Sequence, residues 1–68
     1  MWTPACLDIP ENARNMIRAD IEAETGAINQ YRMHIKMIED DCVNDVLERI
    51  IMDEEYHIMI LHALMKEL

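Results

Sequence analysis

Two stretches of the chain share one spacing of side chains, and that spacing limits the fold. Positions 17 to 38 and 43 to 68 can each be followed in alternating steps of four and three residues. The first series holds Ile17, Ile21, Glu24, Ile28, Tyr31, Ile35 and Ile38, and the second holds Val43, Leu47, Ile50, Glu54, His57, Leu61, Leu64 and Leu68. Such a series, here called an apolar seam, is typical of the buried face of an α-helix. Because the chain has one Gly, two Pro and no Phe, we predict an all-α fold.

The start of the first helix is indicated by its capping residues. Asp8 and Glu11 stand in D-x-x-E spacing with Pro10 between them. This pattern is typical of a capping box with a proline in the first helical turn. We therefore predict an irregular arm over residues 1–8 and a first helix over residues 9–39.

The turn is indicated by a run of acids, Glu39, Asp40 and Asp41. Acids stabilise a helix N-terminus and destabilise a C-terminus, so we predict that the second helix begins here and runs over residues 42–67. A connection of two to four residues returns the chain as an antiparallel hairpin, so residues 1–68 are expected to form a single domain.

Size and charge limit the function. A chain of 68 residues buries only about 60% of its unfolded surface, so a metal or further subunits must supplement its core. Cys6 and Cys42 are too few for a disulfide framework or a cysteine zinc site, which favours a reduced, cytoplasmic setting. The formal charge of −8 disfavours nucleic acid and anionic membranes as partners. The apolar runs are shorter than the ~20 residues of a membrane span, and we expect no signal peptide.

Three ionisable residues interrupt the two apolar seams at one depth. Glu24 lies 14 residues before Ile38 and His57 lies 14 residues after Val43, which places both roughly 20 Å from the turn. Glu54 is one helical turn nearer. Burying a carboxylate is costly unless it is paired or coordinated, and no Lys or Arg occupies either seam. A bound cation would neutralise this group.

The ligand types indicate which cation to expect. Imidazole with carboxylates and no thiolate suits iron, manganese or zinc rather than calcium or magnesium. Glu54 and His57, in Glu-x-x-His spacing, lie on one helical face. Three ligands leave a metal site incomplete, and a second hairpin around a twofold axis would complete it as a four-helix bundle. Two copies each of Glu24, Glu54 and His57 match the ligand set of di-iron and di-manganese carboxylate bundles.

The segments EAETGAINQYRMHI and VLERIIMDEEYHIMIL resemble the two metal-bearing helices of the ferritin-like superfamily. The resemblance covers roughly residues 20–64 and is nearest to the encapsulated ferritin-like proteins, whose subunit is a half-bundle that completes a di-iron centre by dimerising. Rubrerythrin-type helices are also similar. In contrast to the family, we expect neither a cargo-targeting tail nor a counterpart of the additional C-terminal helix in this chain.

The resemblance implies a function and roles for named residues. It makes Glu24, Glu54 and His57 the metal ligands and catalytic residues, with Glu54 as the bridging carboxylate and Tyr31 as an aromatic residue beside them. It implies a ferroxidase that oxidises Fe(II) to Fe(III) with dioxygen or peroxide, for iron storage or detoxification. It further implies a homodimer that assembles into rings inside a protein nanocompartment.

Other readings of the same residues stay open. The centre could reduce peroxide, as in rubrerythrin-like or catalase-like bundles, or the chain could be a non-enzymatic helical dimerisation module. Tyr31 could serve only in packing. His34 and His62 fall off the apolar seams and are expected at the surface or in subunit contacts, and the seven Met are expected to fill helical interfaces.

Two features leave the packing undecided. Gly26 costs about 1 kcal/mol in mid-helix relative to Ala and would permit a close helix approach or a bulge. Apolar residues also flank the second seam, which indicates a broad dimer contact or larger assemblies. These flanking residues are Ile51, Ile58, Met59, Ile60 and Met65.

Overall fold

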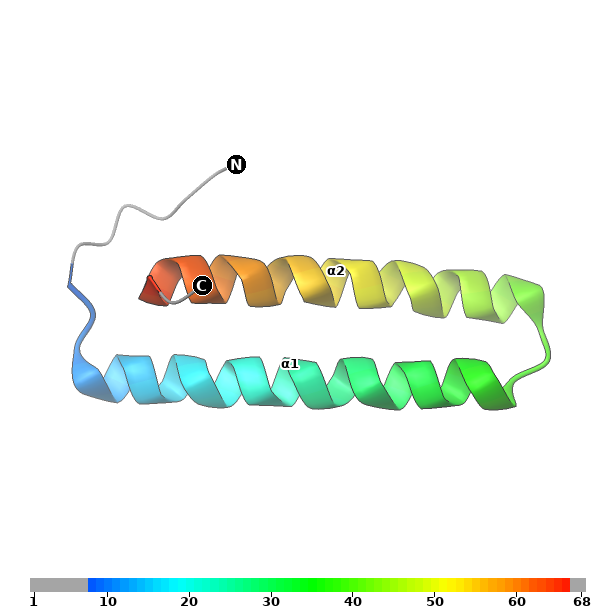
Figure 1. The fold of residues 1–68 in the computed structure, drawn as a ribbon, viewed down its shortest axis with the longest axis horizontal. Coiled ribbons are helices and arrows are strands. Elements are labelled where there is room, and N and C mark those ends of the chain that lie inside the picture. The colour runs from blue at the N-terminus through cyan, green and yellow to red at the C-terminus, as the bar shows by residue number, and fades with distance from the viewer. Residues whose placement is uncertain (1–7, 67–68) are drawn as a thin grey trace.

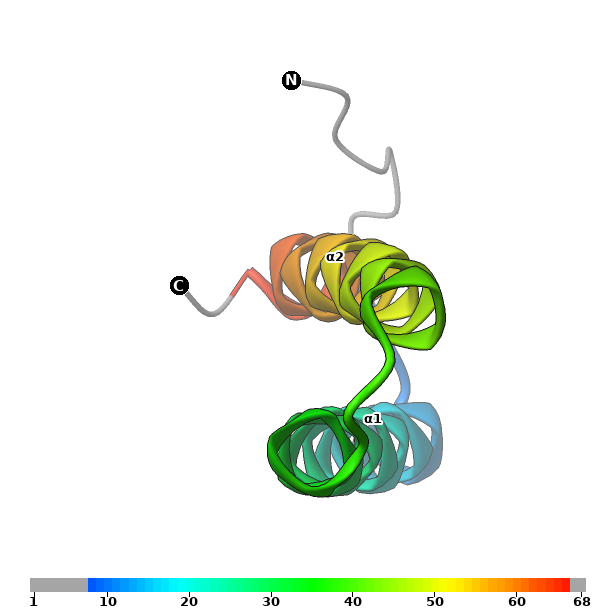
Figure 2. The same cartoon turned by 90° about the vertical axis from the view of Figure 1, so that its right-hand side faces the viewer.

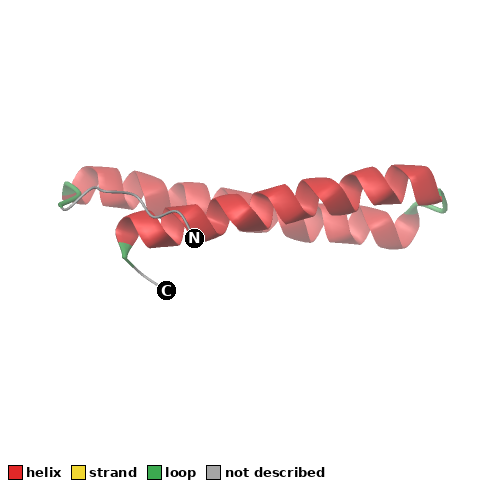
Figure 3. Cartoon of the chain, turned by 90° about the horizontal axis from the view of Figure 1, so that it is seen from above, coloured by secondary structure: helices red, strands yellow, loops and turns green. Residues whose placement is uncertain are grey.

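The computed structural model describes residues 8–66 and consists of two long helices joined by a short turn (Figures 1 and 3). Helix α1 (Glu11–Met37) and helix α2 (Asp41–Met65) run antiparallel, side by side, along most of their length. Residues 38–40 connect them. The predicted all-helical, antiparallel hairpin is confirmed for the part of the chain that the structure describes.

The start of α1 differs from the predicted capping box. Pro10 occupies the N-cap position with extended backbone (φ −56°, ψ 147°), and no side chain caps this end of the helix. The Pro10 carbonyl accepts from the Arg14 N–H at 2.9 Å. The helix therefore begins at Glu11, two residues later than predicted, and Asp8 does not cap it. Residues 1–7 of the predicted arm lie outside the described residues.

The turn is fixed by hydrogen bonds from both sides. Ile38 leaves the helix with extended backbone (φ −90°, ψ 125°), while its N–H still donates to the His34 carbonyl at 2.8 Å. Asp40 caps α2, because its carboxylate accepts from the Val43 N–H at 3.0 Å. The Asn44 amide donates to the Ile38 carbonyl at 2.9 Å. The acidic run thus lies at the N-terminus of α2, as predicted.

The far end of α2 stops at a left-handed residue. Lys66 has φ 58° and ψ 34°, and its N–H donates back to the carbonyls of Ala63 and His62. A left-handed residue cannot continue a right-handed helix, so α2 ends at Met65. The predicted end at residue 67 falls outside the described residues.

Replacing Asp40 with alanine is expected to lower the free energy of unfolding by about 1 kcal/mol, because the Val43 N–H loses its side-chain acceptor. Urea unfolding at one fixed protein concentration measures the change. Asp45→Ala, an exposed acid one turn further along α2, is the matched control. Equal losses in the two variants would show that the effect is one of net charge and not of capping.

The core of a single hairpin is small. Three apolar side chains among the described residues are buried: Ile28 with 7% of its surface exposed, Ile51 with 6% and Met65 with 2%. On α1 the predicted apolar seam does face α2, and all of its members are buried or half-buried. The first helix therefore packs with its predicted face.

The apolar seam of α2 was predicted only in part, because five of its members are half-buried but the most buried residues of this helix lie beside it. Ile51, Ile58 and Met65, which were expected to flank the seam, are buried or half-buried against α1. Val43 and His57, which were expected on the seam, are exposed. The reason is that α2 carries three adjacent rows of apolar residues with a period of seven, and α1 covers two of them more completely than the third. The remaining row consists of Val43, Ile50, His57 and Leu64.

The uncovered row of α2 defines one broad side of the hairpin. It lies beside the α1 row with the same seven-residue period, Ile17, Glu24, Tyr31 and Ile38, whose members are all half-buried. We call the side formed by these two rows the triad face. We call the other side of the hairpin, where Arg32 of α1 pairs with Glu55 of α2, the groove face.

The molecule is one layer thick. Its extents are 46 × 24 × 14 Å and its radius of gyration is 14.6 Å, whereas a compact chain of this length has a radius of gyration of about 11 Å. Seen along the helices, no further element of residues 8–66 covers either side of the pair (Figure 2). Helical domains usually bury their apolar stripes between packed layers, whereas the described residues of this chain form a single layer. Neither described helix contains a segment apolar and long enough to cross a membrane.

Gly26 lies inside the uninterrupted helix α1, and a Cβ built on it would meet nothing within 4 Å. The glycine therefore marks neither a bulge nor a close contact with α2. Gly26→Ala is expected to raise the free energy of unfolding by about 0.5–1 kcal/mol, because alanine loses less backbone entropy on folding. Thermal unfolding tests this, with Ala23→Gly, an exposed site on the same helix, expected to lose a similar amount. A destabilised Gly26→Ala would indicate that another subunit packs closely against this site.

Candidate metal centre

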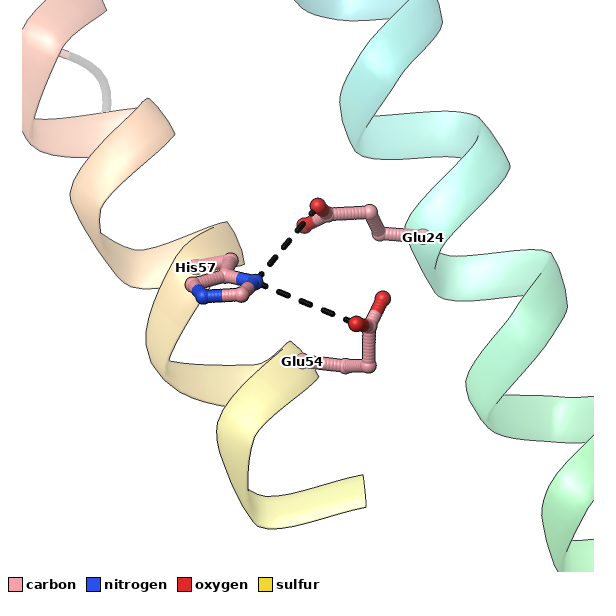
Figure 4. A group of neighbouring side chains, drawn as sticks. All are labelled: Glu24, Glu54 and His57. Atoms are coloured by element: carbon pink, nitrogen blue, oxygen red, sulfur yellow. Dashed lines mark ion pairs between the residues drawn. The ribbon is translucent and has the colours of Figure 1, made fainter. Parts of the chain in front are cut away.

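The hairpin brings Glu24, Glu54 and His57 together from both helices (Figure 4). Glu24 is the central residue of the 27-residue helix α1. Glu54 and His57 are three residues apart in α2, so their side chains lie on one face about one turn apart. The antiparallel turn places the three at one depth, as the equal spacing from the turn predicted.

The donor atoms of the cluster lie close to one another. The Nδ1 atom of His57 is 3.8 Å from Oε1 of Glu24 and 3.8 Å from Oε1 of Glu54. One donor atom from each of the three residues lies within 4.8 Å of the others. Ligand atoms about 2.1 Å from a shared metal ion stand roughly 3–3.6 Å apart, so small side-chain rotations would close the cluster around one ion. These residues fit a metal.

The three side chains of the cluster lie close together, but no hydrogen bond joins His57 to either carboxylate. A separation of 3.8 Å is too long for a hydrogen bond between His57 and either carboxylate. The second oxygen of Glu24, Oε2, is buried and has no hydrogen-bond partner. A buried acceptor without a partner is costly, by about 1–3 kcal/mol. A cation bound between the three side chains would satisfy it.

The cluster opens to solvent on the triad face. The side chains of Glu24 and Glu54 are 27% and 24% exposed, whereas that of His57 is 53% exposed. The sequence predicted all three on the seams inside the hairpin, and this is wrong for His57 in a single chain. His57 belongs to the row of α2 that α1 leaves uncovered. The imidazole thus lies at the rim of a half-open site.

The nearby guanidinium groups are engaged elsewhere. Arg32 pairs with Glu55 at 3.1 Å, and Arg49 pairs with Asp53 at 3.7 Å. Both acids are exposed and lie outside the cluster. Two carboxylates beside one imidazole therefore form a locally anionic site, which attracts a cation.

The other candidate residues lie apart from the cluster. Tyr31 is half-buried on the triad face, one heptad and about 10 Å along α1 from Glu24. His34 is exposed, as predicted. His62 was expected at the surface or in a subunit contact, but it is half-buried within one chain and its Nδ1 is buried without a partner. The shift in the register of α2 explains this, because His62 lies beside the Ile58 and Met65 row. Cys42 is exposed and free.

Comparison of the chain with protein-family models, with curated proteins and with solved structures found no match. The case for a function therefore rests on the residues and their geometry.

Proposed function

We propose that this chain is a half-ferritin-like subunit that oxidises Fe(II) to Fe(III) at a di-iron centre shared between two copies. The observation that carries the proposal is the cluster of Glu24, Glu54 and His57, whose donor atoms lie within 4.8 Å of one another on an uncovered side of the hairpin. The resemblance of both helices to the ferritin-like superfamily supports the same reading.

The proposed dimer accounts for two deficiencies of a single chain. Three donor side chains leave a metal ion with open coordination positions, and three buried side chains make a small core. Packing two triad faces around a twofold axis supplies the second layer of a four-helix bundle. Glu24 is the central residue of α1. A twofold axis that passes at the level of Glu24 would therefore let the two hairpins overlap along most of their length.

Each residue of the cluster has a proposed role. The Glu54 carboxylates of the two copies would bridge or clamp the pair of metal ions, and Glu24 and His57 would complete the ligands of each ion. A carboxylate-rich set favours the harder Fe(III) product over Fe(II), which assists oxidation. Manganese or zinc could occupy the same donors. Tyr31 lies on the same face and would act beside the ligands, not as one of them.

The stoichiometry of the reaction supplies a test. Each Fe(II) gives up one electron, so a pair reduces one O₂ to one H₂O₂ with uptake of two protons, whereas H₂O₂ as oxidant is reduced to water by the same pair. An oxygen electrode, together with the near-ultraviolet absorbance of Fe(III), follows both reactions. We expect protein-dependent oxidation that saturates at about one iron per chain.

Each outcome of this experiment selects one function. Slow reaction with O₂ and fast reaction with H₂O₂ would support the peroxide-reducing alternative. Tight binding of zinc with no oxidation of iron would indicate a structural metal site. A dimer that binds none of these metals would be a helical dimerisation module, and the proposed function would be rejected.

A further inference from the structure

The outer side of α1 carries two methionines and a histidine near the end of the helix. Met33 is 59% exposed and Met37 is 73% exposed, which is the highest value among the large apolar side chains of the described residues. His34 is also exposed. Met37 comes two residues after Ile35, or about 200° around the helix axis, and Ile35 is half-buried on the seam that faces α2. The three side chains therefore lie on the side of α1 that α2 leaves open.

Helical spacing brings the donor atoms of these three side chains within reach of one another. Met33 and Met37 are four residues apart and His34 and Met37 are three apart, so the Cβ atoms of each pair stand about 5–6 Å from each other. All three side chains lie within an arc of about 100° around the helix, with Met37 between the other two. A methionine has three rotatable bonds, so its sulfur can turn toward a shared ion. One ion above this turn could thus bind two thioether sulfurs and one imidazole nitrogen.

The types of donor select the cation. Thioether sulfur is a soft ligand that favours Cu(I), whereas carboxylate oxygen favours harder ions. Imidazole nitrogen binds copper as well as iron and zinc. Between Glu24 and its last residue, Met37, helix α1 carries no acid. The group therefore offers soft donors without the oxygens of the candidate iron centre.

The end of α1 attracts positive charge. The helix ends at Met37, so His34 and Met37 stand in its last turn, where the helix dipole is negative. The acids of the turn, residues 39–41, follow directly and are exposed. Arg32 and Lys36, the two cations of this stretch, line a hollow on the groove face instead. A cation at the outer side of α1 is therefore stabilised by its surroundings.

The end of α2 repeats the His-x-x-Met spacing in a setting that disfavours a cation. His62 and Met65 are three residues apart, but Met65 is only 2% exposed and belongs to the core. The Arg14 guanidinium donates to the Met65 carbonyl at 3.1 Å and places a positive charge at this end. Spacing alone does not make a site, and exposure and charge favour the end of α1.

We propose that Met33, His34 and Met37 form a binding site for a soft monovalent cation, Cu(I). The three residues follow Glu24 by nine to thirteen positions, which places them roughly 14–20 Å along α1 from the candidate iron centre. Their donors are sulfur and imidazole nitrogen, whereas the iron centre is rich in carboxylates. The soft site does not rest on the proposed function.

Silver is the first probe of this site, because Ag(I) is a soft monovalent cation like Cu(I) and stays in one oxidation state in air. Cysteine thiolates also bind soft cations, and Cys42 is exposed and free. Every protein in the experiment therefore carries Cys6→Ser and Cys42→Ser in the full chain, and this double variant is the reference. Silver nitrate is added in a chloride-free buffer to protein labelled with ¹³C at the methionine methyl groups.

The NMR signals of individual side chains report where silver binds. The methyl signals of Met33 and Met37 and the ring signals of His34 are expected to shift together and to stop shifting at one ion per chain. Met16 is 65% exposed and has no other Met or His within four residues, so its signal is the control and should not move. A Met16 signal that shifts as readily as those of Met33 and Met37 would overturn the site.

Substitution of single donors tests the same site by affinity. Met37→Leu and His34→Gln are each expected to weaken silver binding by at least about tenfold, because two donors remain. Met16→Leu, the matched control, should bind silver like the reference protein. Anaerobic competition for Cu(I) with the chromophoric chelator bicinchoninate should give the same order of variants. Binding by Met37→Leu that equals the reference would also overturn the site.

Iron oxidation by the reference protein, measured in parallel, separates the two proposals. If this protein oxidises iron while silver leaves the signals of Met33 and Met37 unmoved, the soft site is wrong and the proposed function stands. If silver binds at these methionines while the protein neither binds nor oxidises iron, the soft site stands and the proposed function is rejected.

Discussion

Replacing His57 with alanine is expected to reduce the rate of Fe(II) oxidation by at least about 100-fold, and Glu54→Gln and Glu24→Gln should have similar effects. The reason is that each chain supplies only three donors, so losing one leaves two to hold an ion. Substituting a residue that merely orients a metal ligand lowers metal affinity or activity by about 10–100-fold. Losing a ligand itself should lower the oxidation rate by at least the upper end of that range. Stopped-flow mixing of the apoprotein with Fe(II) in air measures the initial rate.

Two controls separate ligand loss from misfolding. Asp53→Asn changes the neighbouring acid of α2, which is exposed and pairs with Arg49, and it should leave oxidation near the parent rate. The apoprotein of each ligand variant should unfold at no lower urea concentration than the parent, because a carboxylate oxygen of Glu24 is buried without a partner in the absence of metal. Full activity in His57→Ala would rule out the imidazole as a ligand.

Ile50→Glu is expected to convert the proposed dimer to a monomer and to abolish iron oxidation together with it. Ile50 lies in the same row of α2 as His57, one heptad nearer the turn, and it is half-buried on the triad face. A glutamate there would add a charge of the same sign beside the carboxylates of two chains. Burying it without a partner should weaken dimerisation by at least about 100-fold, or about 3 kcal/mol.

Sedimentation equilibrium and the iron oxidation rate test this together. Met33→Glu adds the same charge at a methionine that is 59% exposed on α1. Because it lies on neither the triad face nor the groove face, this control should stay dimeric and active. A monomeric Ile50→Glu that still oxidised iron at the parent rate would show that one hairpin suffices, and the shared centre would be excluded.

The hairpin itself was predictable because local signals agreed. Alternating steps of four and three residues indicate a helix without reference to tertiary structure, and an acid such as Asp40 at a turn caps whatever helix follows. The depth of the cluster also followed from counting residues from the turn, because residues at equal sequence distances from an antiparallel turn lie side by side. Glu24 and His57 meet for this reason.

The register of α2 could not be predicted from its sequence. Ile50 and Ile51 are adjacent in the chain and equally apolar, yet Ile51 is buried against α1 and Ile50 lies at the rim of the triad face. Three adjacent apolar rows offer two ways to pack a neighbouring pair, and the choice depends on the surface of α1. The same uncertainty placed His57 inside the hairpin instead of at its edge. At Pro10, the D-x-x-E pattern predicted a cap, but the proline itself occupies the N-cap position.

The most direct measurement is a crystal structure of the iron-loaded protein with anomalous diffraction recorded on both sides of the iron absorption edge. The account predicts two iron peaks close to a twofold axis, each within about 2.0–2.3 Å of donor atoms from Glu24, Glu54 and His57, with both copies of the chain contributing. Triads that lie far apart in the assembled protein, or iron bound elsewhere while His57 faces solvent, would contradict it.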